Sequence, residues 1–235
     1  MSKYRALVSI PEFGKDAVCV DWAKPGLLAW KSAVEAKGGK LKANSLTRTC
    51  EQQNVLRAKY VAWLNAGKPS PAVAAANKPG RSGHQAGFSI DAQTVGAFPS
   101  APANKQVDLL WETGKPHGFT PIIASPDESL SERWHFDQWG DWKSVKDHMG
   151  YETTCLCGAL DVGQAGEWQS DERLVQALLL RLGYDIGEPD GILGKRSVAA
   201  LATLKLPFVK GASLEPTIIA LRAMPASSVW KKVTV

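Results

Sequence analysis

The sequence holds few of the side chains that form disulfides or metal sites. It has four cysteines in 235 residues, and no second pair follows Cys155 and Cys157 at the spacing of a zinc ribbon. Because thiols stay reduced in a cytosolic protein, we expect four free thiols with packing roles. Histidine is equally scarce, so a histidine-based site must draw on four residues. These are His84, His117, His135 and His148.

Long apolar runs are also missing. No stretch approaches the ~20 apolar residues that a membrane span needs. The first apolar stretch, residues 6–10, is shorter than the h-region of a signal peptide, which has about 7–15 residues. We therefore expect no membrane insertion and no export signal in this sequence.

Basic runs interleaved with aromatic residues are absent, which argues against a nucleic-acid partner. The net charge of +5 nevertheless lies wholly in residues 1–150, which hold 19 Lys and Arg against 14 Asp and Glu. The positive electrostatic field of this charge favours anionic partners, including cell-wall polymers. The same charge also fits a role in solubility alone.

Apolar periodicity predicts helices early in the chain and several strands later, an order that indicates an α+β domain. The expected helices cover residues 24–38, 51–66 and 105–114. The expected strands cover residues 86–95 and 117–125 and the segment around Trp134–Phe136.

A segment with little periodicity follows, and it predicts a domain boundary. Beyond it, three helices are expected over residues 171–182, 195–204 and 216–223, the first with Asp171 as its N-cap and Gly183 at its end. The sequence thus predicts a catalytic domain (residues 1–150), a linker (residues 151–167) and a small three-helix domain (residues 168–235).

Two segments crowd polar side chains around a histidine, residues 82–91 and residues 132–135. Two histidines and one aspartate from these segments, His84, Asp91 and His135, would make a three-ligand zinc set that leaves a fourth position for water. Glu132 would then be a nearby carboxylate able to serve as general base. Taken alone, the spacing fits equally well a histidine in a turn and an aspartate at a strand end.

The same two segments resemble the signature of the VanX/VanY-type zinc D-alanyl-D-alanine peptidases and related endolysin peptidases, S-x-H-x-x-G-x-A-x-D followed by E-x-W-H. One position departs from it, since Ser89 stands where the family usually has Ala. The matching residues are Ser82, His84, Gly87, Asp91, Glu132, Trp134 and His135. The resemblance implies zinc bound by the two histidines and Asp91, with Glu132 as catalytic base and Ser82 orienting a ligand or the substrate carboxylate.

A looser match surrounds Arg48. Residues 45–49, followed by Glu51 and Gln52, resemble the family's S-G-Y-R-S segment and the start of its next helix. That resemblance makes Arg48 the cation that faces the scissile carbonyl. His117 and His148 are interpreted as structural or surface groups, with His148 the alternative ligand if His135 does not bind the metal.

The C-terminal part has a resemblance of its own, to the helical peptidoglycan-binding domain. It is carried by residues 173–178, 182–184, 190–194 and 197–201. Because the D-G-I-L-G loop also serves as a plain tight turn, the alternative is a helical domain that only packs on the catalytic one.

These resemblances together imply a peptidoglycan-degrading zinc metallopeptidase that resembles phage endolysins and cuts the L-Ala–D-Glu bond of the peptide stem. The alternative is a D-alanyl-D-alanine carboxypeptidase. A non-catalytic cell-wall-binding protein and a cytosolic dipeptidase are less favoured. We expect a monomer with zinc as cofactor and peptidoglycan as partner, held in the host cytoplasm until lysis and then acting at the cell wall or periplasm.

Overall fold

A four-stranded antiparallel sheet lies at the centre of the N-terminal part. The computed structural model describes residues 2–122, 132–206 and 208–234. In spatial order the strands are β3 (Ala43–Ser45), β4 (Ser89–Ala92), β6 (His135–Gln138) and β5 (Phe119–Pro121). Strands β4, β5 and β6 lie in the three segments predicted as strands, but β4 and β5 are shorter than predicted, since residue 86 belongs to a helix and residue 117 to a 3-10 turn. Residues 123–125 of the second predicted strand lie outside the described residues. The mixed helix-and-sheet architecture agrees with the predicted α+β class.

Strands β4 and β6 present polar side chains on one face and apolar side chains on the other. Their register pairs Ser89 with Asp137, Ile90 with Phe136 and Asp91 with His135. Side chains alternate between the two faces of a strand, so the two polar pairs share a face. The middle pair, Ile90 and Phe136, is fully buried in the core on the opposite face.

Helices α1 (Lys24–Ala36) and α4 (Gln106–Gly114) pack against this core, as predicted for both segments. Trp30 of α1 lies at 4.7 Å from the ring of Phe119 and 4.9 Å from that of Phe136. Its Nε1 donates to Thr113 Oγ1 of α4 at 3.1 Å, which satisfies its polar atom inside the core. An N-terminal hairpin of β1 (Leu7–Ser9) and β2 (Val18–Val20), not predicted from the sequence, joins this part.

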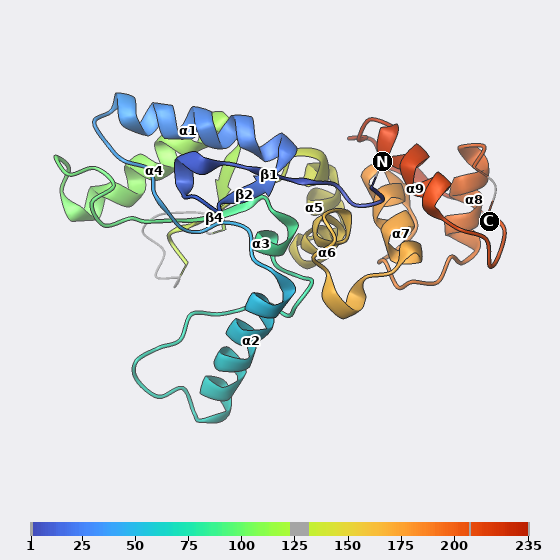
Figure 1. The fold of residues 1–235 in the computed structure, drawn as a ribbon, viewed down its shortest axis with the longest axis horizontal. Helices are drawn as coiled ribbons and strands as arrows, with labels where there is room; N and C mark the ends of the chain where they lie inside the picture. Colours follow the sequence, from blue (N-terminus) through green and yellow to red (C-terminus); the bar gives the residue numbers. More distant parts are fainter. Residues whose placement is uncertain (1, 123–131, 207, 235) are drawn as a thin grey trace.

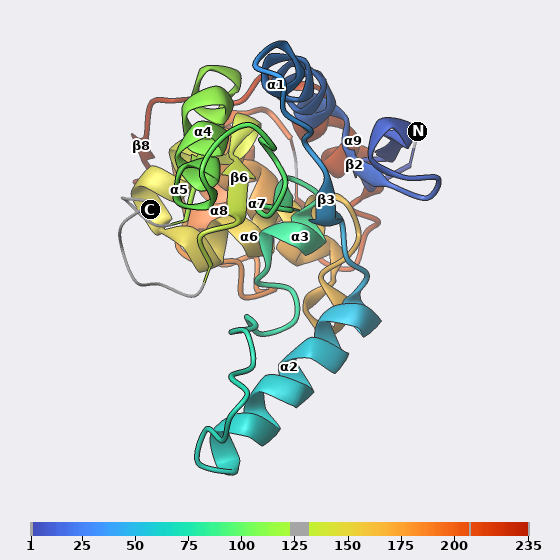
Figure 2. The same cartoon turned by 90° about the vertical axis from the view of Figure 1, so that its left-hand side faces the viewer.

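Helix α2 (Cys50–Asn65) projects away from the body of the molecule (Figures 1 and 2). Thr49 begins it with a capping box, in which Thr49 and Gln52 each bind the other's backbone N–H. Gln53 is its one buried residue. The predicted helix over residues 51–66 is thus confirmed as an arm that lies largely outside the core.

The structure differs from the expected linker at residues 151–161, which form helix α6 (Tyr151–Asp161) after α5 (Lys143–Met149). All residues of α6 from Thr153 onward are buried. A helix buried on every side has no polar face, so its sequence lacks the periodicity of an amphipathic helix. Gly158 is needed here because a Cβ would lie 2.6 Å from the Cβ of Ala86 in the N-terminal part.

Three helices follow as predicted, α7 (Asp171–Arg181), α8 (Lys195–Thr203) and α9 (Glu215–Ala223), with a small parallel pair of β7 (Tyr184–Asp185) and β8 (Lys231–Lys232). The predicted N-cap is off by one residue. Ser170 caps α7 by accepting from the backbone N–H of Arg173, whereas Asp171 lies in the first turn. There its charge still favours the positive end of the helix dipole.

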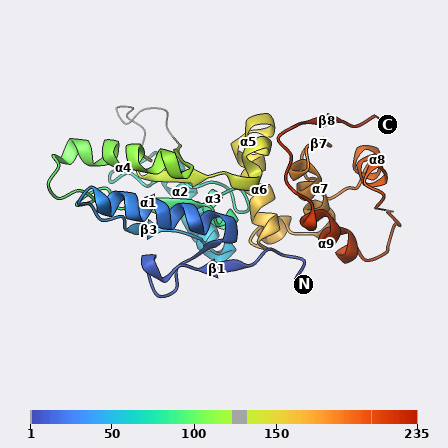
Figure 3. The same ribbon diagram turned by 90° about the horizontal axis from the view of Figure 1, so that it is seen from above.

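Helices α5 and α6 lie between the sheet and helices α7–α9 (Figures 1 and 3). One hydrophobic cluster runs from Ala86 and Phe88, beside the sheet, through α5 and α6 to α7–α9. Partly buried ion pairs between side chains stabilise the contact between the N-terminal and C-terminal parts. Asp161 of α6 binds Arg222 of α9 at 2.7 Å and Arg5 at 3.3 Å, and Arg5 also binds Asp141 at 2.9 Å. The N-terminal and C-terminal parts are therefore held together by α6 rather than tethered by a flexible segment.

All four cysteines are free thiols, as predicted, and three of them, Cys19, Cys155 and Cys157, are buried. Burial raises the pKa of the Cys19 thiol to about 11, so the thiol stays protonated and unreactive at neutral pH. Within the described residues, no helix combines the length and the apolar character needed to cross a bilayer.

Candidate metal centre

Three predicted ligands, His84, Asp91 and His135, come together at the polar face of β4 and β6. One ligand atom from each lies within 4.8 Å of the others. Asp91 Oδ1 is 3.2 Å from His84 Nε2 and 2.9 Å from His135 Nδ1. Two imidazoles and a carboxylate form the donor set of a catalytic zinc site with room for a fourth ligand.

His84 is held by the turn that precedes β4. It lies in the short helix α3 (Gly83–Ala86), and Gly87 ends that turn with a left-handed backbone (φ +77°) that returns the chain to the sheet. His84 Nδ1 donates to the carbonyl of Leu46 at 2.5 Å, which leaves Nε2 facing Asp91. Burial lowers the pKa of His84 despite the nearby Asp91, so the imidazole is neutral and able to bind a metal.

His135 faces Asp91 through Nδ1, whereas His84 faces it through Nε2. The Nε2 atom of His135 lies 3.0 Å from Asp137 Oδ1. Burial opposes protonation of the ring, but the two carboxylates outweigh it and raise the pKa of His135 to about 10. In the metal-free protein both nitrogens therefore donate to carboxylates, so a metal that bound at Nδ1 would displace a proton.

Arg48 contacts Asp91, one of the three predicted ligands, directly. Its Nη2 donates to Asp91 Oδ2 at 2.8 Å, while Nη1 donates to Gln53 Oε1 and Nε to Ser45 Oγ, both at 3.2 Å. The sequence predicted a cation that faces the substrate. The structure places Arg48 behind the oxygen of Asp91 that does not face the histidines, at the edge of the same cleft.

A cleft of about 580 Å³ opens over the three ligands. Ser82 and Glu132, both predicted site residues, line it together with Tyr151. Burial raises the pKa of Glu132, with smaller opposing effects from His135 and Arg48. The outer wall is built from α2 and from the extended segment after it. It is lined by Gln53, Leu56, Lys59 and residues 73–77.

Asp137, Lys59 and Tyr151 were not predicted as site residues. Asp137 follows His135 by two positions in a strand, so the two-residue period offered a signal for it. Lys59 and Tyr151 offered none, because their approach to the cleft depends on how α2 and α6 pack.

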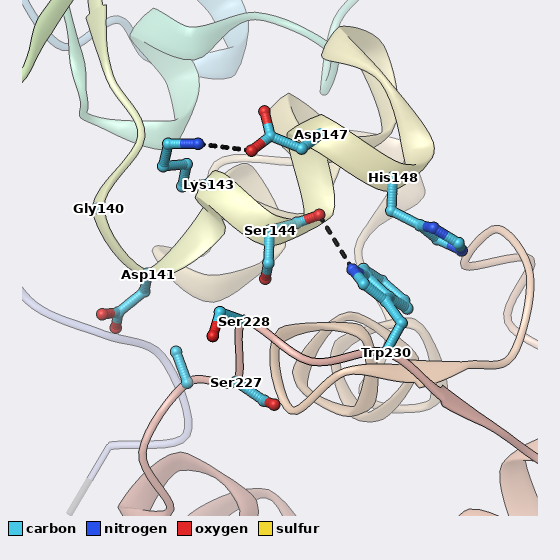
Figure 4. Close-up of a pocket in the computed structure, with 10 residues that line it drawn as sticks. Gly140, Asp141, Lys143, Ser144, Asp147, His148, Ser227, Ser228 and Trp230 are labelled. Atoms are coloured by element: carbon cyan, nitrogen blue, oxygen red, sulfur yellow. Dashed lines mark hydrogen bonds and ion pairs between the residues drawn. The ribbon is translucent and has the colours of Figure 1, made fainter.

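The two remaining histidines lie outside the metal cluster. His117 uses its backbone carbonyl to accept from Gln138 Nε2. His148 stacks on Trp230 with ring centroids 3.9 Å apart, in a second groove of about 490 Å³ between α5 and the C-terminal tail (Figure 4). Trp230 is fixed there by its Nε1, which donates to the carbonyl of Ser144 at 3.3 Å. None of the three ligands lines this groove.

Two solved structures resemble this chain. One is the vancomycin-resistance D,D-pentapeptidase VanY from a VanB-type cassette, a mutant in complex with Zn(II), which is 23% identical over 57% of this chain and 78% of that one, with a TM-score of 0.45. The other is VanYB in complex with D-alanine-D-alanine, 23% identical over 62% of this chain and 83% of that one, with a TM-score of 0.46. No protein-family model matches this chain, and no curated protein sequence matches it either.

Proposed function

We propose that this protein is a zinc peptidase of peptidoglycan stem peptides that removes the terminal D-alanine from D-alanyl-D-alanine. One observation carries the proposal: the His84, Asp91 and His135 cluster lies at the floor of a cleft that also holds Glu132. Two histidines, one carboxylate ligand and one further carboxylate are the parts that metal-assisted peptide hydrolysis needs.

When bound, zinc would lower the pKa of its water toward ~7 and polarise the scissile carbonyl. Glu132 accepts the proton of the attacking water and returns it to the leaving amine. Its raised pKa suits this exchange, because a general base works best when its pKa lies near the working pH. Arg48 stabilises the developing oxyanion, from its position beside Asp91 at the edge of the cleft.

The wall formed by α2 fits an acidic peptide. Leu56 and Lys59 lie three and six residues beyond Gln53, which places them about 4.5 and 9 Å further along the helix axis at ~1.5 Å per residue. Leu56 and Ile122 expose apolar side chains, 37% and 40% accessible, that suit alanyl methyl groups. Lys59 brings a positive charge into the cleft, which suits a stem carboxylate.

Removal of a terminal residue is favoured over an internal cut because the motif from Glu132 to His135 resembles that of the D-alanyl-D-alanine carboxypeptidases. Cleavage of the L-Ala–D-Glu bond, which would release the cross-linked mesh, is the competing outcome.

We further propose that residues 168–235 bind peptidoglycan. Gln176, itself buried, holds the D-G-I-L-G loop rigid. Its Nε2 donates to Asp190 Oδ1 at 2.7 Å, and its Oε1 accepts from the backbone N–H of Gly191 at 2.8 Å. The loop exposes Ile192, which is 70% accessible. Such a preorganised loop binds with little loss of conformational freedom.

Mass spectrometry of digested peptidoglycan tests the proposal. Zinc-loaded protein should release free D-alanine from purified stem pentapeptides and from sacculi, with no loss of turbidity in the sacculi. The Glu132→Ala variant should keep its zinc and release none. Clearing of the sacculi with new D-Glu amino termini would identify the endopeptidase instead. Absence of any product from zinc-loaded wild-type protein would exclude a peptidase of this substrate.

A further inference from the structure

Asp137 lies behind the metal ligand His135 and on the same face of β6. It is 1% accessible, and its Oδ1 is 3.0 Å from His135 Nε2. Its other oxygen, Oδ2, is buried without a hydrogen-bond partner among the described residues. A buried carboxylate is costly unless it is paired. The contacts of Asp137 are concentrated on Oδ1, the oxygen that holds the ligand's ring.

Ser89 completes this arrangement from the neighbouring strand. It lies directly opposite Asp137 in the register of β4 and β6, it is 4% accessible, and its Oγ donates to Asp137 Oδ1. Ser89 is also the position at which this chain departs from the Ala of the resembled signature. An alanine here would leave Asp137 Oδ1 with the His135 ring as its one side-chain partner among the described residues.

The side chains of Ser89 and Asp137 fill the space next to Gly83. A Cβ added at Gly83 would lie 2.8 Å from Asp137 Oδ1 and would collide with the hydroxyl of Ser89. Gly83 has no positive φ, so its backbone does not demand glycine. Glycine precedes His84 because the Ser89–Asp137 pair occupies the volume of a side chain.

We propose that Ser89 and Asp137 act as positioning residues for the metal ligand His135. Asp137 accepts the proton of Nε2 and so directs the lone pair of Nδ1 toward the metal, while Ser89 orients the carboxylate that does so. A carboxylate that accepts from the second nitrogen of a histidine ligand fixes its tautomer and raises its basicity. With a metal bound, the two histidines would thereby be held in opposite tautomers, since the Leu46 carbonyl binds Nδ1 of His84.

This inference rests on the proposed metal site, and zinc affinity tests the two separately. The dissociation constant is measured by competition with a chromophoric chelator for the wild type, Asp137→Ala, Ser89→Ala and the double variant. Loss of a carboxylate behind a histidine ligand weakens metal affinity about 10- to 100-fold. We expect that loss for Asp137→Ala and a smaller one, roughly threefold to tenfold, for Ser89→Ala. The double variant should match Asp137→Ala, because Ser89 acts through Asp137.

Ser197→Ala is the matched control. It also removes a buried serine hydroxyl, 2% accessible, but from α8 in the C-terminal part, and its zinc affinity should equal that of the wild type. Nitrogen-15 spectra of the histidine side chains in zinc-loaded wild-type protein give a second readout. They should show a protonated Nε2 in His135 and a protonated Nδ1 in His84.

The possible results distinguish a failure of the metal site from a failure of the positioning role. If the wild type binds no zinc, the proposed function fails. If the wild type binds zinc but Ser89→Ala and Asp137→Ala bind it within twofold as well, or if His135 coordinates through Nε2, the positioning role is wrong while the metal site stands. Should Asp137→Ala fail to fold, as judged by circular dichroism, Ser89→Ala and the nitrogen-15 spectra still decide the question.

Discussion

Arg48 donates from Nη2 to Asp91 Oδ2 at 2.8 Å, so a candidate catalytic cation is bound to a candidate metal ligand. Through this contact Arg48 orients the carboxylate of Asp91. It also places a positive charge at the edge of the cleft. In Arg48→Ala we expect zinc affinity to fall about tenfold. At saturating zinc, kcat should still fall on the order of 10²- to 10³-fold, as for a lost oxyanion donor. A variant within twofold of the wild type in both quantities would show that Arg48 serves neither role.

Zinc affinity should rise with pH across the neutral range. His135, whose pKa is raised to about 10 by Asp137 and Asp91 against the effect of burial, carries a proton that zinc must displace. His84, with its lowered pKa, contributes none. Apparent affinity should therefore improve about tenfold per pH unit between pH 7 and 9, with close to one proton released. Calorimetry in buffers of different ionisation enthalpy measures this number, and a value near zero would contradict the assignment.

Lys59 should contribute to substrate binding rather than to chemistry. For Lys59→Gln, a lost interaction of about 0.2–1 kcal/mol with a stem carboxylate corresponds to a rise in KM of up to roughly fivefold, with kcat unchanged. The effect should weaken at high salt, because the lysine lies toward the outer end of the cleft wall. Lys15→Gln, an exposed lysine in the N-terminal hairpin, is the control. An unchanged KM at low salt would remove Lys59 from the substrate site.

The whole chain should unfold in one transition, because α6 belongs to the core of both parts. Asp161→Ala should destabilise it by up to about 3–5 kcal/mol, since the change removes the buried carboxylate that binds Arg222 and leaves Arg5 with Asp141 as its remaining close carboxylate partner. Urea unfolding followed by circular dichroism and tryptophan fluorescence measures both effects. For the same reason, removal of residues 166–235 should expose α6 and yield a misfolded fragment. Two separated transitions, or a stable and active truncated protein, would show independent domains.

The elements that could be predicted from the sequence are those whose residue pattern is contained within one short segment of the chain. The apolar stripe of α1 and the flanking glycine of α7 indicate helices directly, and the two motif segments identify the residues of the metal cluster. The sheet then explains why they meet, since Asp91 and His135 are cross-strand neighbours.

What could not be predicted depends on packing. Helix α6 is buried all round, so its composition resembles that of an irregular segment until its neighbours are known. The contact of Arg48 with Asp91 also depends on tertiary structure, because 43 residues separate the two. Asp137 is an intermediate case, since its position in the strand is local but its partner Ser89 lies on another strand.

A zinc titration that records bound metal and D-alanine release together tests the central claim most directly. Metal-free protein is supplied with increasing zinc and assayed on a stem pentapeptide that ends in D-alanyl-D-alanine. We predict that both signals rise together and saturate at one zinc per chain, and that Glu132→Ala shows the metal signal alone. Release of D-alanine without zinc, or stoichiometric zinc binding with no cleavage by the wild type, would contradict the account.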